Sequence, residues 1–289
     1  MIHIKKIGVV GAGIMGSGIA QVASLGGFQV VMHDLDSTIV EKGFDSIKKS
    51  LSIMMKKGKI DPGQDRKILS NIAGTSHIEE VVEGVDLIIE AIPENKELKT
   101  ALFHELDIKS PQHTILATNT SSISISAIAA ATKRPSKCVG MHFANPVPVM
   151  PGVELIRGID TDDDTVEVAK YVLKRMGKEF YVSLDFPGFL GNRLLMLFIN
   201  EAFNILWQGI GNREDIDRNC RLAFRHPMGP LELADFIGLD TVLSISDYLF
   251  NEISEKYRPS PLLKQLVTAG HLGRKTGRGV YEYETTNTK

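Results

Sequence analysis

Two side chains in the middle of the sequence have the types and spacing of an acid/base pair. His142 follows the apolar run Cys138–Met141, and Glu154 lies twelve residues later in a second apolar run, Val153–Ile156. Two strands joined by a turn of that length can bring the carboxylate beside the imidazole. Histidine transfers protons near neutral pH, and a carboxylate on its far nitrogen would fix the tautomer and stabilise the imidazolium. The spacing indicates a general acid/base dyad. A structural histidine, with Glu154 salt-bridged elsewhere, is the alternative.

A proline constrains the segment that leaves the first of these runs. Pro146 holds Asn145 in an extended backbone, so His142 and Asn145 should occupy a rigid, non-helical exit from the strand. At the active edge of a sheet, such an exit would present both side chains to a ligand.

A glycine-rich turn near the N-terminus has the pattern that dinucleotide-binding proteins use for phosphate. The β-branched run Ile7–Val10 leads into Gly11, Gly13 and Gly16 in the order G-x-G-x-x-G, and a helix should follow. Gly11 permits the tight turn, Gly13 lets the backbone touch a pyrophosphate, and Gly16 lets the helix pack closely on the strand. We expect Ile14–Met15, between the last two glycines, to contact the cofactor too.

An acidic residue after the next apolar run strengthens this interpretation. Phe28–His33 should be a strand, and it ends at Asp34, eighteen residues beyond Gly16. A carboxylate there accepts hydrogen bonds from both ribose hydroxyls of an adenosine and repels a 2′-phosphate, which favours NAD over NADP. A glycine-rich turn beside a solvated aspartate is the alternative.

A helical pair should project from this nucleotide-binding region. Val40, Phe44, Ile47, Leu51 and Met54 recur at steps of four and three, which predicts an amphipathic helix that ends near Gly58. After the turn at Asp61–Gly63, the residues Ile68, Leu69 and Ile72 suggest a second, shorter helix. The cluster Lys56, Lys57 and Lys59 is either a solvated helix end or an electrostatic clamp for a phosphorylated substrate.

Polar side chains follow two further predicted strands, Val85–Ala91 and Thr114–Ala117. Glu90, Glu94 and Asn95 lie at the end of the first, and Asn119–Ser122 follows the second. Alternating strands and helices predict a mostly parallel sheet that binds ligands at the carboxyl ends of its strands. These side chains should face a dinucleotide or its reaction partner, although Thr120 or Ser121 could simply cap the next helix.

The composition is that of an ordinary globular protein. Of 289 residues, 43% are hydrophobic and 24% charged, and the formal net charge of −2 gives no general attraction to nucleic acid. Cys138 and Cys220 have no metal-ligand spacing, so we predict no metal site and a reduced, cytoplasmic protein. The longest apolar stretch, Leu194–Leu206, contains polar residues and is too short to span a bilayer, so no membrane partner is expected.

The last third of the chain changes character. A helix over Thr161–Met176 and a last strand over Glu179–Leu184 should close a domain of residues 1–184. Long helical periodicity then predicts an all-α domain over 187–289, whose helices, such as the one containing Leu190–Leu206, are more apolar than a lone small domain needs. The fold class is therefore α/β: a Rossmann-type, mostly parallel sheet with an inserted helical hairpin, followed by a helical C-terminal domain that should associate with other helices.

Six motifs, in order along nearly the whole chain, resemble those of the 3-hydroxyacyl-CoA dehydrogenase family, and the compact length resembles its short-chain bacterial members. The motifs are Gly11–Gln21, Asn119–Ser122, Gly140–Pro146, Pro187–Phe189 with Asn192–Leu194, His226–Leu231 and Gly273–Tyr281. The resemblance implies an NAD-dependent enzyme that interconverts an L-3-hydroxyacyl-CoA of short chain, 3-hydroxybutyryl-CoA, and its 3-ketoacyl-CoA. It also implies a homodimer built on the C-terminal domain.

The resemblance assigns roles to individual residues. His142 is implied as the catalytic acid/base and Glu154 as its partner, with Ser121 and Asn192 on the substrate oxygens. The residues implied to contact NAD are Asp34, Glu94, Lys99, Asn119, Asn145 and Lys275, and Ser50 and Lys57 are implied to contact CoA.

One departure concerns the loop between the two dyad residues. Family members usually carry Lys-Leu after Pro-Val-Met, whereas Met150 is followed here by Pro151–Gly152. Because Glu154 keeps its spacing from His142, we expect the dyad to survive beside an altered substrate wall. An NAD-dependent sugar-acid dehydrogenase on the same scaffold and a non-catalytic dinucleotide-binding protein are the alternative functions.

Overall fold

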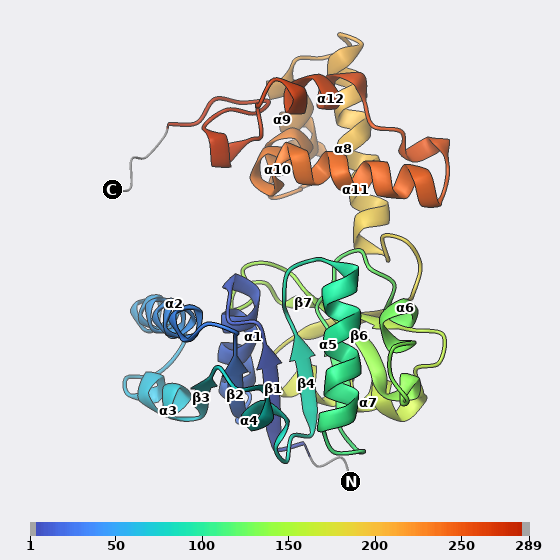
Figure 1. Cartoon of the computed structure of the whole chain (residues 1–289). Coiled ribbons are helices and arrows are strands. Elements are labelled where there is room, and N and C mark those ends of the chain that lie inside the picture. The colour runs from blue at the N-terminus through green and yellow to red at the C-terminus, as the bar shows by residue number, and fades with distance from the viewer. Residues whose placement is uncertain (1–3, 285–289) are drawn as a thin grey trace. The chain divides into compact units, whose positions relative to one another are not determined.

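An eight-stranded sheet organises the first of two units, Met1–Phe186 and Pro187–Lys289 (Figure 1). The structure is a computed structural model that describes residues 4–284. The strand order is β3-β2-β1-β4-β5-β6-β7-β8. The strands are β1 (Lys6–Val10), β2 (Gln29–His33), β3 (Ile72–Thr75), β4 (Leu87–Glu90), β5 (Ile115–Thr118), β6 (Cys138–Phe143), β7 (Gly152–Arg157) and β8 (Glu179–Leu184).

The order of the strands creates a switch point at β1. This strand pairs in parallel with β2 on one side and with β4 on the other. The chain therefore leaves for opposite halves of the sheet at the carboxyl ends of β1 and β4, which is where open α/β sheets bind their ligands. The predicted mostly parallel, Rossmann-type sheet is confirmed, and β6 with β7 forms the antiparallel pair.

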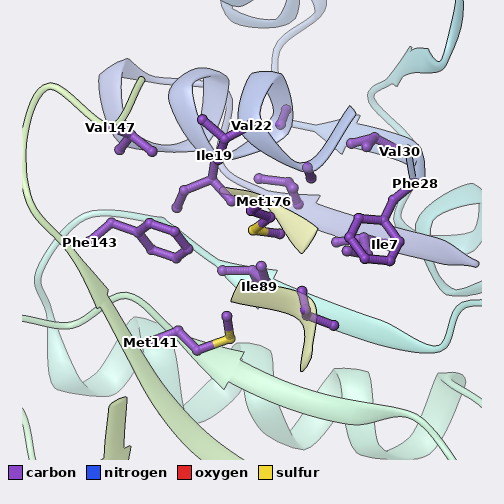
Figure 2. Close-up of a cluster of buried hydrophobic side chains, with 14 of the residues drawn as sticks. Ile7, Ile19, Val22, Phe28, Val30, Ile89, Met141, Phe143, Val147 and Met176 are labelled. Carbon is purple, nitrogen blue, oxygen red and sulfur yellow. The ribbon is translucent and has the colours of Figure 1, made fainter. Parts of the chain in front are cut away.

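Helices cover both faces of the sheet. One face packs on α1 (Ile14–Leu25), α2 (Ser37–Lys56), α3 (Gln64–Ser70) and α7 (Asp163–Arg175), and the other on α4 (Ile78–Val82), α5 (Lys96–Lys109) and α6 (Ile125–Ala129). Figure 2 shows the first interface, with Ile19 and Val22 of α1 above Ile7, Ile89 and Met141 of the strands. Burial on both faces explains why the central strands read as continuous apolar runs.

The inserted hairpin is present, but part of its prediction is wrong. Helix α2 begins after Asp36, whose carboxylate accepts from the Thr38 N–H, and ends just before Gly58, whose φ is +64°. Helix α3 stops at Ser70, and Ile72, expected in that helix, belongs to the edge strand β3 and pairs with Val30. The strand was missed because its apolar residue continues the spacing of the helix before it.

The second unit is built from helices around its own core. They are α8 (Gly191–Trp207), α9 (Arg213–Ala223), α10 (Pro230–Ile237), α11 (Leu239–Glu252) and α12 (Pro261–Thr268). Two buried carboxylates tie the last segment to them. Asp235 accepts from the N–H groups of Val280 and Tyr281, and Asp217 accepts from the Tyr281 hydroxyl. The predicted all-α C-terminal domain is confirmed.

Candidate active site

Strand register brings His142 and Glu154 together. The antiparallel ladder of β6 and β7 pairs them directly, and Nδ1 of His142 lies 3.8 Å from Oε2 of Glu154. The Glu154 side chain is only 1% exposed, whereas that of His142 is 23% exposed. A buried carboxylate therefore faces Nδ1 of a partly exposed imidazole. The two residues meet as the spacing predicted, although His142 lies within β6 and not in the exit loop.

Tyr181 lies on the neighbouring strand β8, next to Glu154. It pairs with Glu154 in the ladder of β7 and β8. The pKa of the Tyr181 phenol is raised by partial burial and by the nearby negative charge of Glu154.

The exit loop after β6 is held by backbone contacts. The Asn145–Pro146 peptide bond is cis, and the Pro146 carbonyl accepts from the N–H groups of Val149 and Met150. Asn145 is exposed at the start of this loop. Close by in the fold, the Asn119 carbonyl Oδ1 accepts from the Phe143 N–H at 2.9 Å, which joins the end of β5 to β6.

The glycine loop has the geometry of a phosphate-binding turn. Gly11 has a φ of +104°, and a Cβ there would lie 2.5 Å from the Ala91 carbonyl oxygen. A Cβ on Gly16 would lie 1.7 Å from the Gly11 carbonyl oxygen. Only a glycine at this position lets the helix pack so closely on the turn. At Gly13, by contrast, an added Cβ meets nothing within 4 Å. The first and third glycines serve packing, and the second borders open space.

The start of α1 and Asp34 fit the two ends of an adenosine diphosphate group. Helix α1 begins at Ile14 without a side-chain cap and without an acidic residue in its first turn, which leaves a positive helix end for an anion. Asp34 Oδ2 accepts from the Ala12 N–H at 2.9 Å, so the carboxylate is fixed to the glycine loop itself. Ile14 is 77% exposed at the same turn. Their chemistry suits an NAD cofactor, and their individual contacts with it stay a prediction.

A buried charge network lies beyond β4. Lys99, 1% exposed, bonds Glu90 at 2.6 Å and the Ile92 carbonyl at 3.2 Å, and lies 3.4 Å from Glu94. The Thr118 hydroxyl donates to the other oxygen of Glu90. The ammonium of Lys99 is thus already bonded to protein oxygens. The NAD contact implied for Lys99 stays a prediction. In the described structure, Lys99 links two carboxylates.

Glu94 organises the turn that carries Ser121. Its Oε1 accepts from the Thr120 hydroxyl, from the N–H groups of Ser121 and Ser122, and from the Ser122 hydroxyl. Burial tends to raise the pKa of Glu94, but the hydrogen bond from Thr120 and the charge of Lys99 outweigh burial and hold it below its ordinary value. Ser124, and not Thr120 or Ser121, caps the following helix, since its side chain accepts from the Ala127 N–H.

The residues implied to meet CoA lie on α2. Ser50 is partly buried in its last third and Lys57 is exposed at its end. Lys56 and Lys59 are exposed beside Lys57. The hairpin therefore presents a cationic tip to solvent, and its role toward a phosphate-bearing ligand stays a prediction.

Two predicted site residues belong to the second unit. Asn192 lies in the first turn of α8. Lys275 lies in a 3-10 turn, and its ammonium bonds both oxygens of Asp240 at 2.6 Å. Their approach to His142 and to the cofactor stays a prediction.

Sequence reasoning missed two residues that hold segments of the candidate site in place. Asp185 accepts from the Ser124 hydroxyl and from the N–H groups of Ile125 and Ser126, so it tethers the segment that follows Ser121. Lys178 is buried and donates to carbonyls of the exit loop. Neither has a local sequence signal, because their partners lie far away along the chain.

The fold, the glycine loop and the facing side chains of His142 and Glu154 are those of a dinucleotide-binding oxidoreductase of the Rossmann type. Residues 6–185 match the family profile described as the 3-hydroxyacyl-CoA dehydrogenase NAD binding domain, and residues 188–283 match the C-terminal domain of the same family. The chain therefore belongs to the 3-hydroxyacyl-CoA dehydrogenase family, as its motifs predicted.

Individual relatives match over nearly their whole length. The chain is 49% identical over 97% of its length to a 3-hydroxybutyryl-CoA dehydrogenase of Bradyrhizobium diazoefficiens, with 96% of that protein covered. It is 48% identical to a probable 3-hydroxybutyryl-CoA dehydrogenase of Bacillus subtilis, with 98% of each chain covered. A crystal structure of (S)-3-hydroxybutyryl-CoA dehydrogenase from Ralstonia eutropha superposes with a TM-score of 0.95 at 44% identity, and the match covers 98% of this chain and 100% of that one.

The described residues hold neither a membrane-spanning helix nor a cluster of metal-ligating side chains. Within residues 4–284, every helix is too short or too polar to cross a bilayer. The same residues contain no group of three or more His, Cys, Asp or Glu side chains arranged to hold a metal ion.

Proposed function

We propose that this protein interconverts an L-3-hydroxyacyl-CoA of short chain, such as 3-hydroxybutyryl-CoA, and the corresponding 3-ketoacyl-CoA with NAD as cofactor. One observation carries the proposal: buried Glu154 faces Nδ1 of the partly exposed His142 across the β6–β7 ladder. The activities named for the relatives support the choice of substrate.

The geometry of the pair supports a specific division of labour. With Nδ1 of His142 directed at Glu154, that nitrogen would carry a hydrogen and the other ring nitrogen would take the proton of the substrate hydroxyl. Glu154 would then stabilise the imidazolium without itself gaining the proton. In the reverse direction, the imidazolium would return the proton to the oxygen of the ketone.

Cofactor binding would fall to the switch point of the sheet. When bound, NAD supplies the group that accepts the hydride from C3 of the hydroxyacyl chain. The open space at Gly13 and the uncapped start of α1 would hold the pyrophosphate, and Asp34 would accept from the adenosine ribose. Glu94, Asn119 and Asn145 would line the reacting end.

Four residues would contact the substrate. Ser121 and Asn192 would orient the hydroxyl and carbonyl oxygens of the acyl chain. Ser50 and Lys57 would meet the CoA moiety, whose phosphates suit the cationic tip of α2 even though the protein carries a net charge of −2.

A homodimer through the second unit completes the proposal. Leu222 is 70% exposed and Phe224 58% exposed, and Trp207 and Phe236 are also exposed. Exposed large apolar side chains mark an association surface where they form one patch. Sedimentation at several protein concentrations tests this, and a monomer throughout would contradict it. The protein would act in the cytoplasm.

Consumption of NADH with acetoacetyl-CoA tests the function directly. NADPH and a sugar keto acid serve as parallel comparisons. Turnover with NADH and the CoA ester is expected. Turnover with the sugar acid alone would favour a sugar-acid dehydrogenase, and NADH binding without any turnover would favour a dinucleotide-binding protein that lacks catalysis.

A further inference from the structure

One buried ammonium closes the loop between the two dyad residues. Lys178 is 8% exposed, and its Nζ donates to the carbonyls of Val147 and Met150. The loop has few other ties: Pro146 accepts from two N–H groups of the same loop, and the Pro151 carbonyl accepts from the Glu179 N–H. Lys178 therefore fixes the middle of the loop, from outside it.

The lysine itself is anchored and has no opposite charge beside it. It follows Gly177, whose φ is +69°, and its N–H donates to the Leu173 carbonyl at the end of α7. Among the described residues, no carboxylate lies within ion-pair distance of its ammonium. Burial accordingly lowers the pKa of Lys178.

An uncompensated buried charge needs an explanation beyond packing. A methionine would fill the same space without the desolvation penalty, so what the lysine adds is its pair of charge-assisted hydrogen bonds to backbone carbonyls. Both bonds end on the loop that begins at Asn145 and leads into β7. The buried charge of Lys178 therefore serves to hold this loop in position.

The loop lies between the helix that follows the glycine turn and the strands that carry His142 and Glu154. Val147 is buried against α1, and a Cβ on Gly18 would lie 2.8 Å from the Val147 Cβ. Figure 2 shows Val147 beside the helix that carries Ile19 and Val22, with Phe143 of β6 beneath it. One end of the loop therefore touches the helix that follows the glycine turn, and its flanking strands carry His142 and Glu154.

We propose that Lys178 is a positioning residue for the dehydrogenase reaction, acting through the 145–151 loop on Asn145 and the cofactor. This inference rests on the proposed function. The ladder of β6 and β7 sets the His142–Glu154 pair without help from the loop, so the effect of Lys178 falls on the placement of the cofactor relative to that pair.

The test compares Lys178→Met with Lys174→Met, an exposed lysine on the preceding helix. With Lys178→Met, kcat for acetoacetyl-CoA should fall about tenfold or more, and the kinetic isotope effect with NADH dideuterated at C4 should rise, because hydride transfer becomes slower than the other steps. Lys174→Met should match the wild type. A folded Lys178→Met with wild-type kcat and isotope effect would overturn the proposal.

A double-mutant cycle separates positioning from a merely structural role. If Lys178 acts through Asn145, Lys178→Met should reduce kcat much less in an Asn145→Ala background than in the wild type. Losses that multiply independently would contradict the proposal. Lys178→Gln, which keeps a donor in a neutral side chain, serves if the methionine variant does not fold, and it should lose less activity than Lys178→Ala.

Hydrogen exchange keeps this inference separable from the proposed function. Lys178→Met should accelerate exchange of the Val149 and Met150 amides at least tenfold while amides of β6 and β7 stay protected. If wild-type protein does not reduce acetoacetyl-CoA, the proposed function fails, and the exchange result still decides whether Lys178 holds the loop. Unchanged exchange in the loop would show that Lys178 does not hold the loop, whatever the activity.

Discussion

The backbone N–H of Ser121 donates to Oε1 of Glu94 at 2.9 Å, and the same oxygen accepts three further hydrogen bonds from Thr120 and Ser122. Glu94 thereby fixes the conformation of the turn that presents Ser121. Its second oxygen lies 3.4 Å from the ammonium of Lys99, which a buried Glu90 holds in place. A residue implied to meet NAD is therefore also the organiser of a residue implied to meet the substrate.

Replacement of Glu94 by Gln should reduce stability in a pH-dependent way. The pKa of Glu94 is held below its ordinary value, so its stabilisation is present above the unfolded pKa and is lost as pH falls through the folded pKa. We expect Glu94→Gln to lower the free energy of unfolding by ~1–3 kcal/mol at pH 7, with the difference shrinking below about pH 4.5. Urea unfolding measures this. Glu97→Gln, an exposed change in the first turn of the neighbouring helix α5, should show no such trend.

Replacement of Gly13 and of Gly16 by alanine should affect different properties of the protein. An alanine at Gly13 enters open space, so Gly13→Ala should fold normally and bind NADH at least about tenfold more weakly. An alanine at Gly16 meets the Gly11 carbonyl, so Gly16→Ala should lose about 2 kcal/mol or more of stability. Thermal unfolding and NADH fluorescence titration distinguish the two. Equal loss of stability in both variants would argue against the open space at Gly13.

His142→Gln should reduce kcat on the order of 10²-fold or more while NADH binding stays intact, because it removes the acid/base group and leaves the cofactor site alone. Glu154→Gln should lower kcat as well and change the pH profile of ketone reduction, since the imidazolium loses its facing carboxylate. Steady-state kinetics across pH measure both variants. An identical pH profile in Glu154→Gln would refute the dyad.

Lys57→Ala should act only on substrates that carry the CoA phosphates. We expect a several-fold rise in KM for acetoacetyl-CoA, from the loss of roughly 1 kcal/mol of exposed ion pairing. The corresponding thioester truncated to a short pantetheine fragment should be unaffected. Lys48→Ala, a lysine of the same helix that pairs with Asp45, is the matched control. A KM increase for both substrates would contradict the assignment.

Cys138 should make stability fall at alkaline pH. Burial raises the pKa of its thiol to about 11, so between pH 9 and that value the native state keeps a proton that the unfolded chain has lost. Stability should therefore decrease by up to ~1.4 kcal/mol per pH unit over that window. Urea unfolding of wild type and Cys138→Ala at pH 8, 9 and 10 tests this. Parallel pH slopes in the two proteins would contradict the effect.

Much of the fold follows from local patterns. The periodicity of Val40 to Met54 predicted α2, and the helix predicted over Thr161–Met176 is α7, which Asp162 caps. The edge strand β3 escaped because Ile72 continues a helical spacing, and only pairing with Val30 reveals it as a strand. Tertiary pairing, rather than propensity, decides such short segments.

Some parts of the candidate site could be predicted from local sequence, and others depend on tertiary contacts. His142 and Glu154 could be paired from the sequence because one tight strand connection joins them. Lys178 and Asp185 could not, since their hydrogen bonds reach across 28 to 61 residues to groups on other elements, and in most cases to backbone groups that carry no residue identity. Backbone acceptors leave no trace in a sequence motif.

The ladder that sets His142 opposite Glu154 also makes the pair robust to evolutionary change in the loop. Insertions between residues 144 and 151 leave the strands in step, whereas loss of one residue within β6 or β7 would turn one partner to the opposite face of the sheet. Changes in the length or sequence of the loop therefore leave His142 facing Glu154, because the strand register and not the loop aligns the two side chains.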